Sequence, residues 1–314
     1  MDTLRVGVLG AGAIACEIHL PILRRLAAVE VVGVADPRPT GREAARVFGL
    51  PVFESAEVLL DTARPDCVFV LTPKETHPGL AQACLARGLD VFCEKPLAMR
   101  LADAEATVAA AARAGRLLMV GFNRRFAPVY ERAHAAFRQR QLDVCLAMKN
   151  RPGTEYRASL ENAIHMVDLL RWFCGEAVHV TAETQHQGDP YVETSLVGTI
   201  RFASGALGCL VANRSTSHWV ERLECYGSGW SAVVGSPDWV RIGHDGVEEL
   251  TEMTPQAMGW AAVADKMGFR QEVEHFLACV RDRSEPRTSG PAVLGTHRLM
   301  HDLLVAAGLP GLDV

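Results

Sequence analysis

The chain has 314 residues, which is more than one ordinary hydrophobic core requires and favours two domains. Hydrophobic residues make up 49% and charged residues 22%, as in a typical globular protein, and the net charge is −5. No block of Lys or Arg suggests a nucleic-acid partner, and no apolar run is long enough to cross a bilayer. The nine cysteines form no C-x-x-C pair, which predicts reduced thiols in a cytoplasmic protein without a metal site.

The N-terminal 36 residues carry the strongest local pattern. A short apolar run typical of a strand leads into Gly10, Gly12 and Ala15, and a helical pattern follows over residues 14–29. The first glycine permits a tight turn, the second lets backbone approach a pyrophosphate, and the small third residue allows close helix packing. A second apolar run ends at Asp36, where a carboxylate can accept hydrogen bonds from a ribose diol. We predict a dinucleotide site; the alternative is a tight turn without a ligand.

Short apolar strands and helices then alternate, which predicts βαβ units and a parallel sheet. The run at 67–71 is apolar throughout, as expected of a strand buried on both faces. Ser55 and Thr76 are predicted helix caps. The expected helices cover residues 40–48, 56–63, 77–87 and 101–114, and the expected strands 51–53, 67–71, 90–93 and 117–120.

The second half contains strand-like runs that follow one another without intervening helices, which predicts an antiparallel sheet. These runs cover residues 178–184, 195–202, 207–212 and 222–226, and two helical runs close the chain at 266–281 and 291–307. We therefore expect one domain over residues 1–122 and a second over 123–314.

The stretch 161–172 has the composition of a helix with one polar face. Spacings of four, three and four place Glu161, His165, Asp168 and Trp172 together if the stretch is a continuous α-helix. Such a face can line a wet cleft. The alternative is that the helix is packed in the core and that His165 and Asp168 form a hydrogen bond with each other there.

Several motifs in order along the chain resemble those of the Gfo/Idh/MocA oxidoreductases. They are the glycine turn, Thr72-Pro73 followed by His77, Cys93-Glu94-Lys95-Pro96-Leu97, and Gly121-Phe122-Asn123-Arg124-Arg125-Phe126. The resemblance covers nearly the whole chain. It implies an α/β protein with an N-terminal Rossmann doubly wound parallel sheet and a C-terminal α/β domain with an open, mostly antiparallel sheet. It also implies a last helix that often returns to the first domain, and assembly into a homodimer or homotetramer.

The resemblance also implies roles for particular residues. Family members carry Asp-x-Gly-x-His-x-x-Asp near the catalytic helix, so His165 is the expected general base and Lys95 the residue beside the reacting oxygen. Glu161 replaces the family's aspartate and Ala163 its glycine. Glu161 is expected to orient His165 or bind a substrate hydroxyl, and Asp168 to be a supporting partner or a sugar ligand.

The cofactor implied is NAD, with NADP possible because Arg38 follows Asp36 closely. The expected cofactor-binding residues are Gly10, Gly12, Ala13, Ile14, Asp36, Arg38, Thr72, Pro73, His77, Glu94, Lys95 and Asn123.

Three functions remain open at this point. The leading one is a nicotinamide-dependent dehydrogenase or reductase that acts on a sugar, a polyol or a derivative. The others are an NAD-dependent glycosidase of the same family and a dinucleotide-binding regulator without turnover. The changes at Glu161 and Ala163 keep the regulator open, whereas the intact Lys95 and His165 count against it. A cluster of basic residues is expected on a solvated face, or alternatively in part in the cleft, where it would favour an acid, a phosphate or a nucleotide sugar as substrate. The cluster consists of Arg124, Arg125, Lys149, Arg151 and Arg157.

Overall fold

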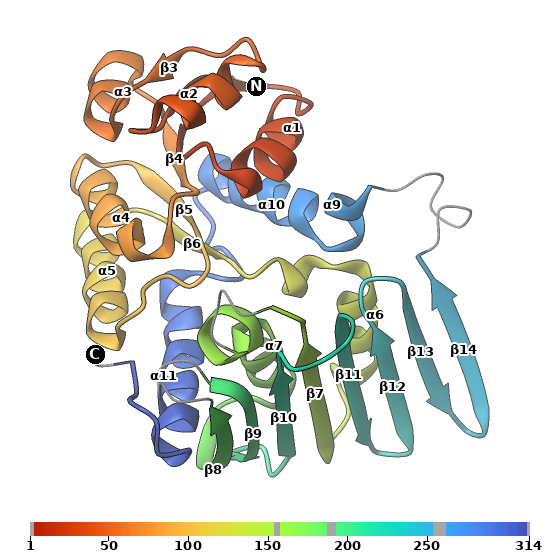
Figure 1. The fold of residues 1–314 in the computed structure, drawn as a ribbon. Coiled ribbons are helices and arrows are strands. Elements are labelled where there is room, and N and C mark those ends of the chain that lie inside the picture. Colours follow the sequence, from red (N-terminus) through yellow and green to blue (C-terminus); the bar gives the residue numbers. More distant parts are fainter. Residues whose placement is uncertain (1–2, 154–157, 187–192, 254–261, 313–314) are drawn as a thin grey trace. The chain divides into compact units, whose positions relative to one another are not determined.

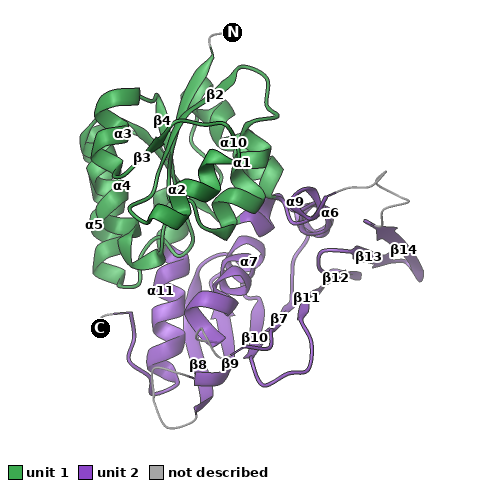
Figure 2. Cartoon of the chain, turned by 45° about the horizontal axis from the view of Figure 1, so that its top comes forward, with its two compact units in different colours: residues 1–122, 269–294 green, residues 123–268, 295–314 purple. Residues whose placement is uncertain are grey.

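The computed structural model describes residues 3–153, 158–186, 193–253 and 262–312. The chain forms two compact units (Figure 2): unit 1 contains residues 1–122 and 269–294, and unit 2 contains residues 123–268 and 295–314. The sequence-based expectation placed residues 123–314 in one domain apart from a returning last helix. In the structure it is the segment 269–294 that belongs to unit 1. The separate cofactor and substrate roles of the two domains stay a prediction.

Unit 1 is built on a six-stranded sheet in the order β3-β2-β1-β4-β5-β6, and every pairing is parallel. Figure 1 labels β3, β4, β5 and β6 of this sheet. The strand order reverses between β1 and β4, so this is a doubly wound Rossmann sheet and the expected fold is confirmed. The strands are β1 (Leu4–Leu9), β2 (Val29–Ala35), β3 (Val52–Phe53), β4 (Cys67–Val70), β5 (Asp90–Glu94) and β6 (Leu118–Gly121).

The core of unit 1 lies around β4, whose residues are all fully buried, as the continuous apolar run predicted. Phe69 stacks on Phe92 of β5 at 4.8 Å, and Phe276 of α10 meets Phe69 edge-on at 5.4 Å. This packing explains why α10 belongs to unit 1. The helices of the unit are η1 (Ile14–His19), α1 (Leu20–Leu23), α2 (Pro39–Arg46), α3 (Ala56–Ala63), η2 (Lys74–Thr76), α4 (His77–Ala86), α5 (Leu101–Ala114) and α10 (Phe269–Asp282).

The helix expected over residues 14–29 is shorter and less regular than predicted. Its first part, η1, is π-helical, and its α-helical part ends at Leu23. Ala28 has a φ of 55°, a left-handed conformation that ends the helical path just before β2 begins. The apolar spacing indicated a helical segment, but it did not indicate where the chain turns back into the sheet.

The two predicted caps differ in the structure. Ser55 caps α3, because its hydroxyl accepts a hydrogen bond from Val58 N at 3.3 Å. Thr76 occupies the N-cap position of α4 without capping it, since its hydroxyl lies 2.7 Å from both Thr72 Oγ1 and Pro73 O. The prediction for Thr76 is therefore wrong: its side chain ties together the turn after β4.

Unit 2 contains an eight-stranded sheet in the order β14-β13-β12-β11-β7-β10-β9-β8. All pairings are antiparallel except that of β7 with β10, so the expected open and mostly antiparallel sheet is confirmed. The strands are β7 (Val144–Asn150), β8 (Ala177–His186), β9 (Glu193–Phe202), β10 (Leu207–Asn213), β11 (Val220–Gly227), β12 (Trp230–Gly235), β13 (Trp239–His244) and β14 (Val247–Glu252). Strands β7, β12, β13 and β14 were not among those predicted.

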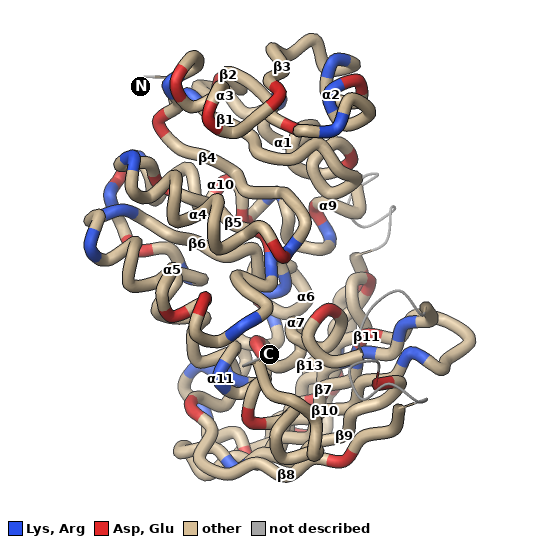
Figure 3. The backbone as a smooth tube through the Cα atoms, turned by 60° about the vertical axis from the view of Figure 1, so that its left-hand side comes forward, with Lys and Arg blue, Asp and Glu red and all other residues tan. Residues whose placement is uncertain are grey.

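The remaining elements are η3 (Asn123–Phe126), α6 (Pro128–Phe137), η4 (Ala158–Ala163), α7 (Ile164–Cys174), α9 (Val263–Lys266) and α11 (Gly290–Ala306). Burial alternates along β9 and β10, so the unit 2 sheet has one packed face and one partly exposed face. Lys and Arg are interspersed with Asp and Glu along the described chain (Figure 3). Among the described residues, no helix combines the length and apolarity needed to cross a membrane.

Candidate functional site

A pocket of about 610 Å³ lies in unit 1 at the carboxyl ends of β1, β2 and β4. This is where the strand order reverses, the usual place for a ligand in a doubly wound sheet. Seven residues of the expected cofactor-binding set line it: Gly10, Gly12, Ile14, Asp36, Arg38, Thr72 and Pro73. Ala13 instead lines an adjoining pocket of about 310 Å³, which also includes Gly12 and Arg38.

The two glycines of the turn serve different purposes. Gly10 has a φ of 96°, and a Cβ placed on it would lie 2.6 Å from Leu71 O, so the fold itself requires glycine there. A Cβ placed on Gly12 would meet no atom within 4 Å. Protein packing therefore does not explain Gly12, whereas the close approach of a pyrophosphate does. These residues fit a dinucleotide.

The Asp36 carboxylate is almost completely buried and accepts four hydrogen bonds. Ala11 N donates to Oδ2 at 2.9 Å, and Arg38 contributes its backbone N, Nε and Nη2 at 2.9, 3.1 and 2.9 Å. Burial opposes ionisation, but the hydrogen bonds from Arg38 and Ala11 outweigh it and hold the Asp36 pKa below its usual value. A carboxylate has about four acceptor positions, and these four hydrogen bonds occupy them. A ribose diol that binds Asp36 must therefore displace the Arg38 guanidinium.

Gly41, in the first turn of α2, is a determinant of this arrangement that the sequence analysis missed. A Cβ placed on Gly41 would lie 2.4 Å from the Asp36 carboxyl carbon. Glycine thus leaves room for the carboxylate against the start of a helix. The signal was a glycine inside a helical pattern, which often marks such a close approach.

His77 is buried at the start of α4 and joins two strand ends. Its Nδ1 lies 2.7 Å from Pro96 O and its Nε2 lies 2.8 Å from Thr72 O. Both ring nitrogens thus face main-chain carbonyls, so the described contacts give His77 the role of holding the turns after β4 and β5 together. Lys95, half-buried between them, donates its backbone N–H to Glu94 Oε2 at 3.1 Å.

The stretch 161–172 is not one continuous α-helix. Glu161 lies in the π-helical η4, and α7 begins only at Ile164. The α-helical spacing therefore applies to His165, Asp168 and Trp172 but not to Glu161. His165 is 4% exposed and Asp168 is fully buried, whereas Glu161 is partly exposed.

Asp168 is held by residues other than His165. Its two oxygens accept hydrogen bonds from Arg125 Nη2 and Nε, both at 2.7 Å, and Thr296 Oγ1 donates to Oδ1 at 2.9 Å. The described contacts therefore do not support the alternative in which His165 and Asp168 form a hydrogen bond with each other in the core. Asn123, an expected cofactor contact, donates to Met267 O at 2.9 Å and accepts from Arg124 Nη1 at 3.1 Å.

The expectation of a solvated basic face is wrong for Arg124, Arg125 and Lys149, which are 5%, 8% and 4% exposed. Arg124 binds both oxygens of Glu221 at 2.9 Å, and Lys149 Nζ lies 3.0 Å from Glu221 Oε2. Burial opposes the ionisation of Glu221, but the two cations hold its pKa far below its usual value. Arg151 is exposed, and Arg157 lies outside the described residues.

Comparison with known proteins identifies the family. Residues 4–122 match the model described as "Oxidoreductase family, NAD-binding Rossmann fold", and residues 131–233 match the "GFO/IDH/MocA C-terminal domain". The chain belongs to the Gfo/Idh/MocA oxidoreductases. The resemblance drawn from its motifs is thereby confirmed, as is the assignment of NAD as the family's cofactor.

Relatives in this family cover most of the chain. The myo-inositol 2-dehydrogenase of Thermotoga maritima is 28% identical, over 91% of each chain. Inositol 2-dehydrogenase 2 of Paenarthrobacter aurescens is 30% identical over 66% of this chain and 68% of its own. An Agrobacterium radiobacter oxidoreductase solved with NAD⁺, L-tartaric acid and magnesium has a TM-score of 0.87 at 18% identity, covering 98% of this chain and 97% of its own.

Proposed function

We propose that this oxidoreductase transfers a hydride between NAD and a hydroxyl or keto carbon of a sugar, polyol or sugar derivative. The observation that carries the proposal is the unit 1 pocket, in which the unfilled space at Gly12 and the buried Asp36 carboxylate suit the pyrophosphate and the ribose of a dinucleotide. The sugar or polyol class is supported by the relatives that are inositol 2-dehydrogenases.

The proposed chemistry gives each of the expected catalytic residues its own role. Bound NAD supplies the hydride acceptor when an alcohol is oxidised. His165 removes the hydroxyl proton as general base, and the Lys95 ammonium stabilises the charge that develops on the reacting oxygen. Glu161 binds a substrate hydroxyl or orients His165. Because Arg125 and Thr296 occupy the Asp168 carboxylate, we assign Asp168 the role of holding α7 and thereby His165 in place.

The proposal is tested by mixing the purified chain with NAD and a panel of inositols, aldoses, sugar acids and nucleotide sugars. We expect absorbance at 340 nm to rise with at least one member of the panel. Glycoside hydrolysis without net NADH would instead identify the glycosidase alternative. Tight NAD binding with no turnover across the panel would identify a regulator.

We predict that NAD binds more tightly than NADP. Asp36 would bind the ribose diol once Arg38 has moved aside, and its charge would repel a 2′-phosphate. Asp36→Ala is expected to weaken NAD binding and to reverse or abolish the preference, because Arg38 then remains free to meet a 2′-phosphate. The measurement is the Kd of both cofactors by calorimetry. A wild-type preference for NADPH would contradict this prediction and make Arg38 the specificity residue.

We also propose that the chain is a homodimer or homotetramer and, from its pattern of unpaired cysteines, cytoplasmic. The partly exposed face of the unit 2 sheet carries apolar side chains on neighbouring strands: Leu146, Val197 and Leu207 are 38%, 44% and 52% exposed. Covering such a face is favourable by about 25 cal/mol per Å² of apolar area. Leu207→Glu is expected to shift the mass measured by light scattering toward the monomer. A wild-type chain that is monomeric at micromolar concentration would rule the assembly out.

A further inference from the structure

Thr296 of α11 lies between two polar side chains of α7. Its hydroxyl accepts a hydrogen bond from Arg171 Nη1 at 3.1 Å and donates one to Asp168 Oδ1 at 2.9 Å. Thr296 and Asp168 are both fully buried. The hydroxyl thus acts as acceptor and donor at once, which a side chain without an oxygen cannot do.

The residue before Thr296 makes room for Arg171. A Cβ placed on Gly295 would lie 2.2 Å from Arg171 Nη2 and 2.4 Å from its Cζ. The guanidinium therefore rests directly against the backbone of α11, and its Nη2 also donates to Glu176 Oε1. Glycine is unfavourable inside a helix, and the space that Arg171 needs explains its presence here.

These hydrogen bonds give α7 a fixed rotation about its axis. Most of α7 is apolar and buried, and the helix packs against β7 and β10. Apolar packing is non-directional, whereas a hydrogen bond holds its atoms within a narrow range of distance and angle. Asp168 and Arg171 are three residues apart and are therefore neighbours on the helix surface. With both held by Thr296, α7 can neither turn nor slide without breaking hydrogen bonds.

The rotation of α7 decides where His165 points. His165 stands three residues before Asp168 in the same α-helix, so the two are about 4.5 Å apart along the axis. A turn or a slide of α7 that moves Asp168 therefore moves the imidazole by a similar amount. Misplacement of a catalytic group by about 1 Å can lower a rate by about 10²-fold.

We propose that Thr296, in the space that Gly295 provides, is a positioning residue for His165. It acts through Asp168 and Arg171, which it holds in place on α7, and needs no contact of its own with substrate or cofactor. The catalytic consequence rests on the proposed function of His165 as the general base.

The test compares Thr296→Val, which removes the hydroxyl, with Thr296→Ser, which keeps it. We expect kcat of Thr296→Val to fall by about 10–10²-fold, with the KM of the substrate and the Kd of NAD nearly unchanged. Thr296→Ser should keep most of the wild-type kcat. Gly295→Ala should also lower kcat, because its Cβ displaces the Arg171 guanidinium although alanine favours the helix.

Leu303→Ala is the control for a loss of stability alone. Leu303 is fully buried two turns further along α11, so its truncation weakens the packing of the same helix without removing a hydrogen bond of Thr296. Its kcat should equal that of wild type at a temperature at which both are folded. An unchanged kcat in Thr296→Val, a Thr296→Ser as slow as Thr296→Val, or an equal fall in Leu303→Ala would overturn the proposal. If Thr296→Val does not fold, Gly295→Ala decides, and a wild-type kcat in that variant overturns it.

A double-mutant cycle shows whether Thr296 acts through His165. When His165 is already replaced by alanine, Thr296→Val should lower the residual kcat no further, because there is no imidazole left to position. A fall by the same factor with and without His165 would contradict the proposal.

Failure of the proposed function gives a different result. The imidazole resonances of His165 can be followed by NMR in protein with isotope-labelled histidine and assigned by their loss in His165→Ala. They should shift in Thr296→Val and stay in place in Leu303→Ala. A wild-type chain that turns over no substrate but shows this shift keeps the positioning role and loses the dehydrogenase. An active enzyme in which neither kcat nor the resonances respond to Thr296→Val keeps the dehydrogenase and loses the positioning role.

Discussion

Lys95→Ala and His165→Ala are each expected to lower kcat by about 10²–10⁴-fold. Both should bind NAD with nearly the wild-type Kd, because the glycine turn and Asp36 are unchanged. The physical reason is that a positioned base and a positioned cation act on the transition state and contribute little to binding of the cofactor. The measurements are steady-state kcat with the best substrate of the panel and the Kd of NAD by calorimetry.

Chemical rescue distinguishes lost chemistry from lost structure. Imidazole should restore part of the turnover of His165→Ala, and a small primary amine should do so for Lys95→Ala. His179→Ala is the control, because it removes an exposed histidine from β8 of the same unit as His165 and should leave kcat unchanged. An unchanged kcat in His165→Ala, or an experimental structure with Lys95 and His165 on opposite surfaces, would end the proposed mechanism.

Glu221→Gln is expected to destabilise the protein by about 3–5 kcal/mol, because it leaves Arg124 and Lys149 buried without their shared anion. Tyr130 also loses a charged acceptor, since its hydroxyl donates to Glu221 Oε1 at 2.9 Å. The free energy of unfolding is measured by urea denaturation. Glu224→Gln on the same strand is the control: its partner Arg222 is 46% exposed, and such a pair contributes about 0–1 kcal/mol.

The pH dependence of this effect has a definite sign. The pKa of Glu221 is lower in the folded than in the unfolded protein, so its stabilising contribution is fully present above the unfolded pKa of about 4.3. The contribution falls as the pH drops below that value toward the folded pKa. The difference between wild type and Glu221→Gln should therefore be constant from about pH 7 to 5 and shrink below about pH 4. A difference that grows on acidification would contradict the assignment.

Features that depend on neighbours in the sequence were predicted well. The helix expected over residues 101–114 coincides with α5, and the apolar run at 67–71 matches the fully buried β4 within one residue. Each βαβ unit is a local structure whose strands, turns and helices carry their own periodicity and glycine signals. Seven of the twelve expected cofactor-binding residues line the pocket, because the carboxyl ends of neighbouring parallel strands share one edge of the sheet.

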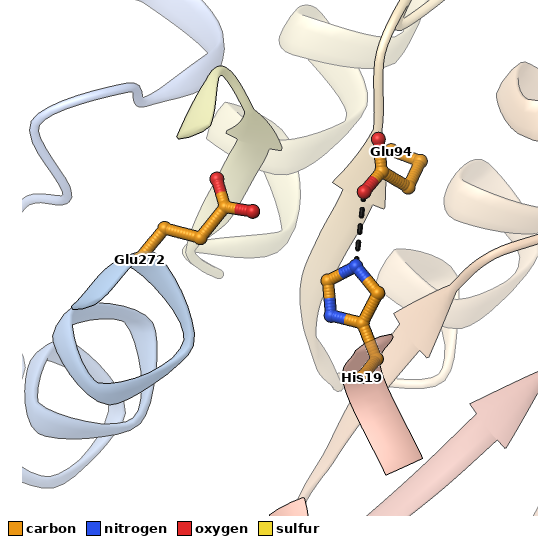
Figure 4. A group of neighbouring side chains, drawn as sticks. All are labelled: His19, Glu94 and Glu272. Carbon is orange, nitrogen blue, oxygen red and sulfur yellow. Dashed lines mark hydrogen bonds and ion pairs between the residues drawn. The ribbon is translucent and has the colours of Figure 1, made fainter. Parts of the chain in front are cut away.

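By itself, the sequence thus determined the Rossmann sheet, the glycine turn, the acidic residue after β2 and the family. The tertiary structure decided what each charged side chain meets. Arg124 and Lys149 are buried because Glu221 reaches them from β11, Arg125 because Asp168 reaches it from α7, and His19 because Glu94 and Glu272 lie beside it (Figure 4). Whether a charged side chain can be buried depends on partners that are distant in the sequence. Residue type and local spacing do not reveal these partners, because only the folded chain brings them next to the charge.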